Sequence, residues 1–209
     1  MPQPMIPMTT LRYNRRFILG AGVAGLAGAL VPGQAFALND SQARALIERA
    51  VTDTNAAIRS GKTGPALYAM FERIFSKYAD VNVIARSALG VAARQASAAQ
   101  MAAFTKAYQG YLSRKYGKRF REFIGAQFEV KGARAIKTFY EVKTTAILKG
   151  QAPFEVLWQV SDRSGQDKFF NLIVEGVNML ASERAEIGAM LDRRRGNIDA
   201  VIQDLKTAG

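Results

Sequence analysis

The spacing of the apolar residues changes near Ala126, and this change limits the folds open to the chain more than any other feature. Before that point apolar residues recur every three or four positions, as at Leu67, Phe71 and Ile74, which is the spacing of an amphipathic helix. Beyond it they alternate with polar residues, which is the pattern of a strand with one buried face. Helices followed by strands in one chain predict an α+β fold.

Caps, turns and periodicity place the individual elements. Asp40 or Ser41 can cap the first helix, and Ser97 with Gln100 forms a capping box for a later one. The predicted class is α+β, with helices packed on one face of a curved, mainly antiparallel four-stranded sheet that encloses an apolar pocket. We expect helices within residues 40–60, 65–78, 80–90, 97–123, 180–191 and 198–205, and strands at 128–131, 140–148, 154–160 and 170–175.

Residues 1–37 have the three parts of an export signal. They contain three arginines and no acidic residue, and an uncharged run at 17–31 is followed by small residues of the kind that signal peptidase reads. That run is shorter than the roughly 18–20 apolar residues of a bilayer-spanning helix. We expect a cleavable signal at 1–37, of the twin-arginine type, and one domain at 38–209. The signal prediction depends on Arg15, Arg16, Ala35 and Ala37.

Three glycines in this segment, Gly20, Gly22 and Gly25, also have the spacing of a dinucleotide-binding loop. That alternative needs a buried strand before the glycines and a second strand after the helix. Only three residues separate Arg16 from Gly20, and no run rich in β-branched residues follows. We therefore assign these glycines to the export segment.

The composition of the chain excludes several kinds of chemistry. The sequence has no histidine and no cysteine, so imidazole catalysis, most zinc sites and disulfides are absent. Without the three arginines of the signal, residues 38–209 carry 26 basic and 17 acidic residues, a net charge of +9. No pair of carboxylates indicates acid–base catalysis, so we predict no catalytic residue, no metal and no cofactor.

Basic residues cluster at the end of the long predicted helix. In an exported protein they can bind anionic lipid headgroups or an acidic partner, whereas the alternative is a solvated helix end whose cations complement the helix dipole. The candidate headgroup or partner surface consists of Arg114, Lys115, Lys118 and Arg119.

Aromatic and aliphatic residues of the same helix and of the sheet should converge. Packed tightly they form only a core, but a curved sheet with helices across its mouth can also enclose an apolar pocket for a hydrophobic ligand. The candidate pocket residues are Tyr108, Tyr111, Leu112, Phe128, Val130, Tyr140, Val142, Val156, Trp158, Phe170 and Leu172.

Two stretches resemble the periplasmic MlaC-like, or toluene-tolerance, family. The first is residues 75–120, where an Asp-led helix with Ala85-Arg86 and Leu89-Gly90 precedes the long helix. The second is residues 169–206, where a strand with Val174-Glu175-Gly176-Val177 is followed by a helix pair around Gly196. The resemblance spans essentially the whole of residues 38–209.

This resemblance implies a periplasmic lipid carrier without enzymatic activity. Such a carrier shuttles phospholipid between an outer-membrane lipoprotein complex and an inner-membrane ABC transporter with an MCE-domain component. The acyl chains would lie in the pocket, and no nucleic acid would be involved. Two alternatives stay open at this point: a carrier of hopanoids or other polycyclic lipids in the same family, and a small histidine-independent periplasmic enzyme on a similar scaffold.

Overall fold

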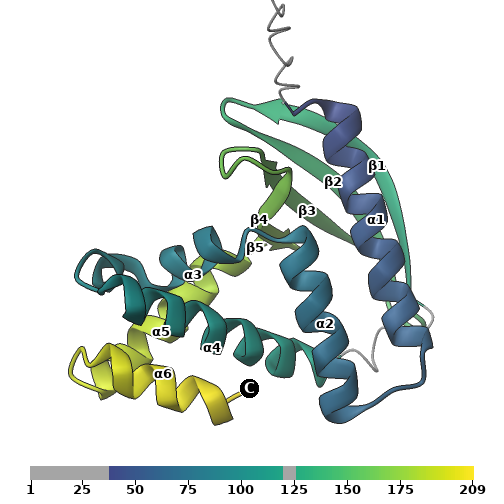
Figure 1. Ribbon diagram of the computed structural model, residues 1–209. Coiled ribbons are helices and arrows are strands. Elements are labelled where there is room, and N and C mark those ends of the chain that lie inside the picture. The colour runs from purple at the N-terminus through teal and green to yellow at the C-terminus, as the bar shows by residue number, and fades with distance from the viewer. Residues whose placement is uncertain (1–37, 120–125) are drawn as a thin grey trace, which may run out of the picture. The chain divides into compact units, whose positions relative to one another are not determined.

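The computed structural model describes residues 38–119 and 126–209, which lie within one compact unit, Phe36–Gly209. The predicted export signal, including Arg15, Arg16, Ala35 and Ala37, lies outside the described residues. The described elements (Figure 1) are α1 (Asp40–Arg59), α2 (Gly64–Tyr78), α3 (Val81–Leu89), the short 3-10 helix η1 (Gly90–Arg94), α4 (Ala98–Gly117), β1 (Gln127–Ile136), β2 (Phe139–Ile147), β3 (Phe154–Ser161), β4 (Lys168–Val174), β5 (Val177–Asn178), α5 (Met179–Arg193) and α6 (Ile198–Thr207).

Local capping explains where the helices begin. The side chain of Ser97 accepts a hydrogen bond from the backbone N–H of Gln100, and the Gln100 side chain accepts one from Ser97, so the predicted capping box of α4 is confirmed. The cap of α1 is Asn39, which forms a similar box with Gln42. The expectation of Asp40 or Ser41 as that cap was wrong by one or two residues, because an asparagine caps as well as either.

The strands form one antiparallel sheet in the order β1-β2-β3-β4-β5. The α+β class is confirmed, but the sheet has five strands where the sequence predicted four. The additional strand, β5, has only two residues and pairs with the end of β4 across a turn at Glu175 and Gly176, both with positive φ. Two residues are too few to show an alternating pattern.

A bulge between β3 and β4 changes which aromatic residue lies beside Trp158. Val160 pairs with Phe169 while Gln159 pairs with Asn171, so Phe170 is the extra residue. The Phe169 ring packs edge-on against Trp158 at 5.3 Å between ring centroids, whereas Phe170 packs against Phe139. The alternation predicted through Phe170 is therefore interrupted at this point.

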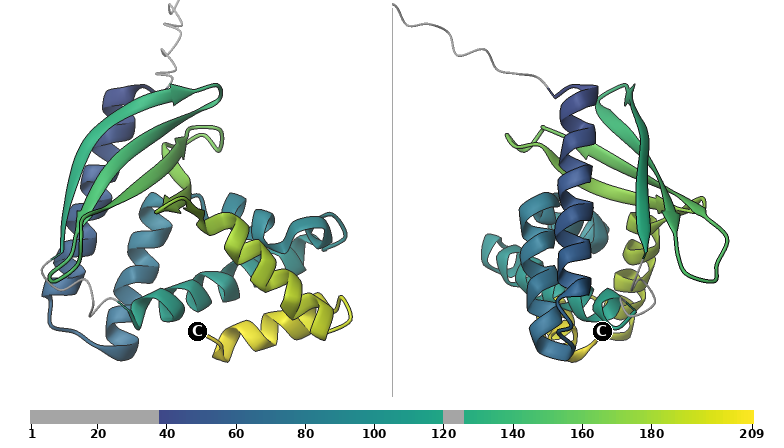
Figure 2. Two further views of the ribbon diagram at one scale, coloured as in Figure 1. Left: turned by 180° about the vertical axis from the view of Figure 1, so that it is seen from behind. Right: turned by 90° about the vertical axis from the view of Figure 1, so that its right-hand side faces the viewer.

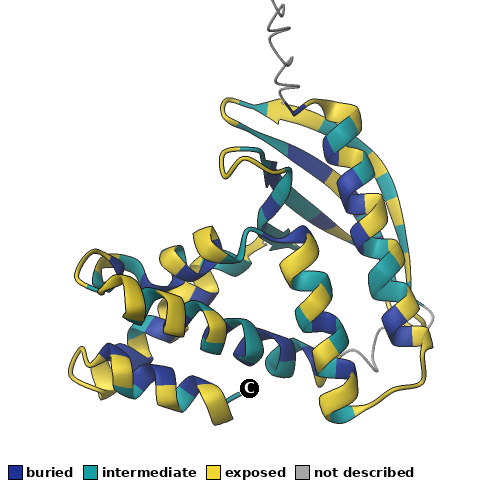
Figure 3. Cartoon of the chain, in the orientation of Figure 1, coloured by how far each residue is buried: buried dark blue, intermediate teal, exposed yellow. Residues whose placement is uncertain are grey.

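The helices cover the apolar face of the sheet through a small set of contacts. Helix α1 packs along β1, β2 and β3, and α3 and α5 both contact β4 (Figure 2). Helix α4 packs against α2, α3 and α6, and none of the described helices has the length and hydrophobicity that crossing a bilayer requires. The main core lies where these elements meet (Figure 3), and its largest fully buried side chains are Tyr108, Phe104, Ile47, Ile187, Leu205, Val142, Val160 and Val201.

Candidate functional site

The apolar face of the sheet is divided into two regions. One region, around Val142 and Val160, is sealed beneath the helices as part of the main core. The other lies where β1 and β3 begin and β2 and β4 end, and we call it the sheet-end cluster. It consists of the buried residues Ala146, Leu148 and Val156 and the half-buried residues Ala126, Phe128, Phe154, Trp158, Leu172 and Val174.

Trp158 and Leu172 belong to both regions and join them. The indole Nε1 of Trp158 donates a hydrogen bond to Oγ1 of Thr144 at 3.0 Å, and this hydroxyl donates to the carbonyl oxygen of Val156 at 3.1 Å. Thr144 is fully buried on the apolar face, so these two bonds satisfy its hydroxyl and orient the indole. The sheet-end cluster therefore presents a fixed indole among half-buried aromatic and aliphatic side chains.

The structure separates the predicted pocket residues by their degree of burial. Phe128, Val156, Trp158 and Leu172 lie together in the sheet-end cluster. Four of the other seven are buried in the main core: Tyr108, Tyr111, Leu112 and Val142. The remaining three are partly buried and pack against that core: Val130, Tyr140 and Phe170. Periodicity assigns a residue to a face but not to the sealed or the open end of that face, so the lipid contact of these residues stays a prediction.

Two of the predicted pocket residues, Tyr108 and Tyr111, take part in a polar cluster that joins α4 to α5. We call it the α4–α5 network, and its members are Tyr108, Tyr111, Lys115, Tyr116, Glu183 and Glu186. Lys115 Nζ donates to Glu183 Oε1 at 2.7 Å, and it also donates to Glu186. Tyr116 and Tyr108 donate their hydroxyl protons to Glu183, and Tyr111 donates to Glu186.

Burial and charge pairing both change the pKa values in this network. Burial alone would lower the pKa of Lys115, but its hydrogen bonds to Glu183 and Glu186 outweigh burial and raise that pKa well above the ordinary value. Burial, reinforced by the neighbouring carboxylates, raises the pKa of Tyr108 and Tyr116. At neutral pH these raised pKa values favour a charged Lys115 and protonated tyrosines, and this arrangement suits a joint between the two helices.

The basic residues that were predicted to face a headgroup or a partner bind other parts of the chain. Nε of Arg114 donates to the carbonyl oxygen of Ala208 at 2.9 Å, and its guanidinium also donates to that of Leu205. Lys115 belongs to the α4–α5 network, and Lys118 donates to the carbonyl oxygen of Gly209. Arg119 also has an interaction of its own. Three of these side chains therefore tie α4 to α5 and to the C-terminal segment.

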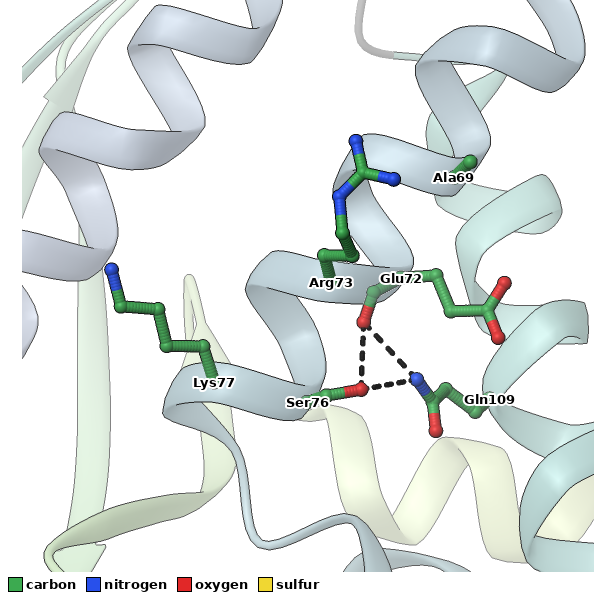
Figure 4. A pocket seen from close by; sticks show the side chains of 6 residues that line it. All are labelled: Ala69, Glu72, Arg73, Ser76, Lys77 and Gln109. Atoms are coloured by element: carbon green, nitrogen blue, oxygen red, sulfur yellow. Dashed lines mark hydrogen bonds between the residues drawn. The ribbon is translucent and has the colours of Figure 1, made fainter.

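An open groove of about 520 Å³ lies between α2 and α4 (Figure 4). Gln109 donates a side-chain hydrogen bond to the carbonyl oxygen of Glu72 at 3.1 Å and another to Ser76, so these bonds cross the groove and hold the two helices together. None of the predicted pocket residues lines it, and the described part of the chain has no group of carboxylates suited to a metal ion. The lining residues are Ala69, Glu72, Arg73, Ser76, Lys77 and Gln109.

Sites for small hydrophobic ligands are lined mainly by apolar and aromatic side chains, and the sheet-end cluster presents such side chains at one end of a helix-covered antiparallel sheet. The fold of this chain is similar to that of a phospholipid-binding protein from Ralstonia solanacearum, whose structure was solved in complex with a phospholipid. The TM-score is 0.65 and the sequence identity is 20%, and the match covers 78% of this chain and 94% of that one. Residues 48–207 match the model of the MlaC protein family, and the chain belongs to this family. MlaC proteins are periplasmic, non-enzymatic phospholipid carriers of the Mla system.

Proposed function

We propose that the sheet-end cluster holds the acyl chains of the phospholipid that this carrier transports. The observation that carries the proposal is the half exposure of Phe128, Phe154 and Trp158 around a buried aliphatic floor. Each methylene group of an acyl chain contributes about 0.8 kcal/mol when it leaves water. A surface of this kind therefore favours an acyl chain, and binding followed by release requires no covalent step.

The experiment is native mass spectrometry of the purified protein before and after incubation with phospholipid vesicles. We expect a bound phospholipid in the wild-type protein and a several-fold lower loaded fraction in a Phe154→Asp variant, because a carboxylate in the cluster cannot shed its hydration at low cost. Phe139→Asp is the matched control: Phe139 is also a half-buried phenylalanine of the sheet, but it packs against Phe170 outside the cluster.

Three results bear on this proposal. Equal loading of the Phe154 and Phe139 variants, with both folded by circular dichroism, would place the acyl chains elsewhere. A charged residue at Trp158 should likewise reduce loading more than a change at Lys118. Extraction of the bound lipid distinguishes a glycerophospholipid from a hopanoid or another polycyclic lipid, the alternative ligand within this family.

We propose further that residues 1–37 direct export and are removed near Ala37. The support is the order of arginines, uncharged run and small residues in that segment. N-terminal sequencing of protein recovered from the periplasm should begin at Leu38. Replacing Arg15 and Arg16 by lysine should abolish export if the twin-arginine route is used, whereas normal export of that variant would indicate the general secretory route.

The partners follow from the family. MlaC proteins work with the Mla transporter, and we propose that this chain exchanges lipid with an inner-membrane MCE-domain/ABC transporter complex and with an outer-membrane lipoprotein complex. Transfer of labelled phospholipid from the loaded protein to each purified complex tests this. Transfer that is no faster than transfer to protein-free vesicles would contradict it.

A further inference from the structure

A second cleft lies between the α3–η1 segment and α5. It has a volume of about 210 Å³, and α3 and α5 pack directly against each other. We call it the arginine cleft, and its lining residues are Arg86, Ser87, Gly90, Val91, Arg94 and Arg184. It shares no residue with the sheet-end cluster or with the α4–α5 network.

The three arginines of this cleft have no partner within residues 38–119 and 126–209. Some other arginines do have one: Arg134 pairs with Glu141 and Arg194 pairs with Asp204. By contrast, Arg86, Arg94 and Arg184 make no ion pair or side-chain hydrogen bond to a described residue, and no carboxylate lines their cleft. Three positive charges thus converge from two segments without neutralisation.

Gly90 allows one of these arginines to lie close to the backbone. A Cβ atom at this position would be 3.2 Å from Nε of Arg184, which is tighter than an ordinary contact. Gly90 also has φ of +64°, a conformation that side-chain-bearing residues rarely adopt. The Arg184 guanidinium therefore lies over the junction of α3 and η1, on the same cleft as Arg86 and Arg94.

We propose that the arginine cleft binds a phosphoryl group. A guanidinium is planar and presents a fork of N–H donors that matches two phosphate oxygens, and Ser87 adds a hydroxyl donor at the same place. A water molecule occupies about 30 Å³ of liquid, so the cleft has room for a phosphate group. Three cations from two segments suit an ion with several charged oxygens better than a single carboxylate.

Two sources can supply this group: inorganic phosphate, or the phosphate of a lipid headgroup at a membrane surface. An apolar side chain beside the arginines favours the headgroup, since Val91 lines the cleft and is 65% exposed. Val83, one helical turn before Ser87, is also exposed. The proposal does not depend on where the carried lipid lies, because phosphate binding can be measured without lipid.

The first measurement is calorimetric titration of the purified protein with inorganic phosphate at low ionic strength. We expect saturable binding that weakens roughly tenfold or more in the triple variant R86Q/R94Q/R184Q, because hydrogen bonds to charged groups are lost. The matched control is R49Q/R59Q/R163Q, which removes three exposed arginines and the same net charge elsewhere. Arg184→Lys keeps the charge but not the fork, and it should also weaken binding. Circular dichroism checks that each variant is folded.

The second measurement compares sedimentation of the protein with phosphatidylglycerol and with phosphatidylcholine vesicles. If the cleft variant loses binding to phosphatidylglycerol vesicles and the control variant does not, the proposal is supported with a lipid headgroup as the source of the phosphoryl group. Loss of phosphate binding with unchanged vesicle binding supports it with free phosphate as the source. The proposal would be overturned if the wild-type, cleft and control proteins bound both phosphate and phosphatidylglycerol vesicles equally, or if both triple variants lost binding equally.

Discussion

Replacing Glu183 by glutamine should destabilise the protein far more than replacing an exposed glutamate. The Glu183 side chain is 5% exposed and accepts hydrogen bonds from Lys115, Tyr116 and Tyr108. Glutamine keeps the shape and one acceptor oxygen, but it removes the charge and turns an N–H group toward one of these donors. Lys115 then keeps only Glu186 as its carboxylate partner.

The size of the effect follows from these contacts. Hydrogen bonds to charged groups contribute about 1.5–3 kcal/mol each, and breaking a buried ion pair costs about 3–5 kcal/mol. Because Glu186 still pairs with Lys115, we expect the lower end, a loss of about 3 kcal/mol in the free energy of unfolding. For a domain of this size that corresponds to a fall of about 6–12 °C in the melting temperature.

Urea unfolding is the assay, read as a lower midpoint with an unchanged slope. Glu48→Gln is the control, since the Arg44–Glu48 pair is half exposed on both sides and should change stability by less than about 0.5 kcal/mol. A double-mutant cycle with Lys115→Met should give a coupling energy of about 0.5–3 kcal/mol. If Glu183→Gln and Glu48→Gln have equal effects, or if the coupling is zero, the reasoning about the α4–α5 network is refuted.

Three further predictions concern stability. The pKa values of Lys115 and Tyr116 are higher in the folded state than in the unfolded state, so the protonated forms of these two groups stabilise the fold. This stabilisation is complete below about pH 10 and is lost as the pH rises further. Urea unfolding from pH 7 to 11 tests this, and a free energy of unfolding that does not change with pH would contradict it. Ile187→Ala, in the fully buried core, should cost about 2–5 kcal/mol in thermal unfolding, whereas Val177→Ala, at a 53% exposed residue, should have almost no effect. Ser97→Ala removes the cap of α4 and should cost about 1 kcal/mol by urea unfolding, and Ser97→Thr should restore most of it.

Local signals in the sequence were sufficient for most of the secondary structure. The Ser97–Gln100 box and the alternation through Tyr140, Val142 and Thr144 depend only on neighbouring residues. Both appear in the structure, although Glu141, between Tyr140 and Val142, is also buried. The strand β5 and the bulge at Phe170 were missed, because both arise from pairing between strands and leave no periodic trace.

The sequence was less informative about the site. Four residues of the sheet-end cluster were among the predicted pocket residues, and they share one face of the sheet. Their common face follows from the alternation of side chains along a strand. Tyr108 and Val142 lie in the sealed part of the protein, whereas Phe128 is half exposed. This difference depends on where the helices end over that face of the sheet. The arginine cleft gave no local signal, since its guanidinium groups come from α3, η1 and α5.

The sequence by itself determined the order of helices and strands, the apolar face of each and the family to which the chain belongs, because periodicity, caps and spacing are properties of neighbouring residues. The tertiary structure decided which charges are neutralised and which apolar residues are sealed. Lys115 and Glu183 are 68 positions apart, and only the tertiary fold brings their side chains together. The tertiary fold also places Arg86, Arg94 and Arg184 in one cleft that no carboxylate lines. Pairing and burial are decided by distance in space, which the order of the residues does not contain.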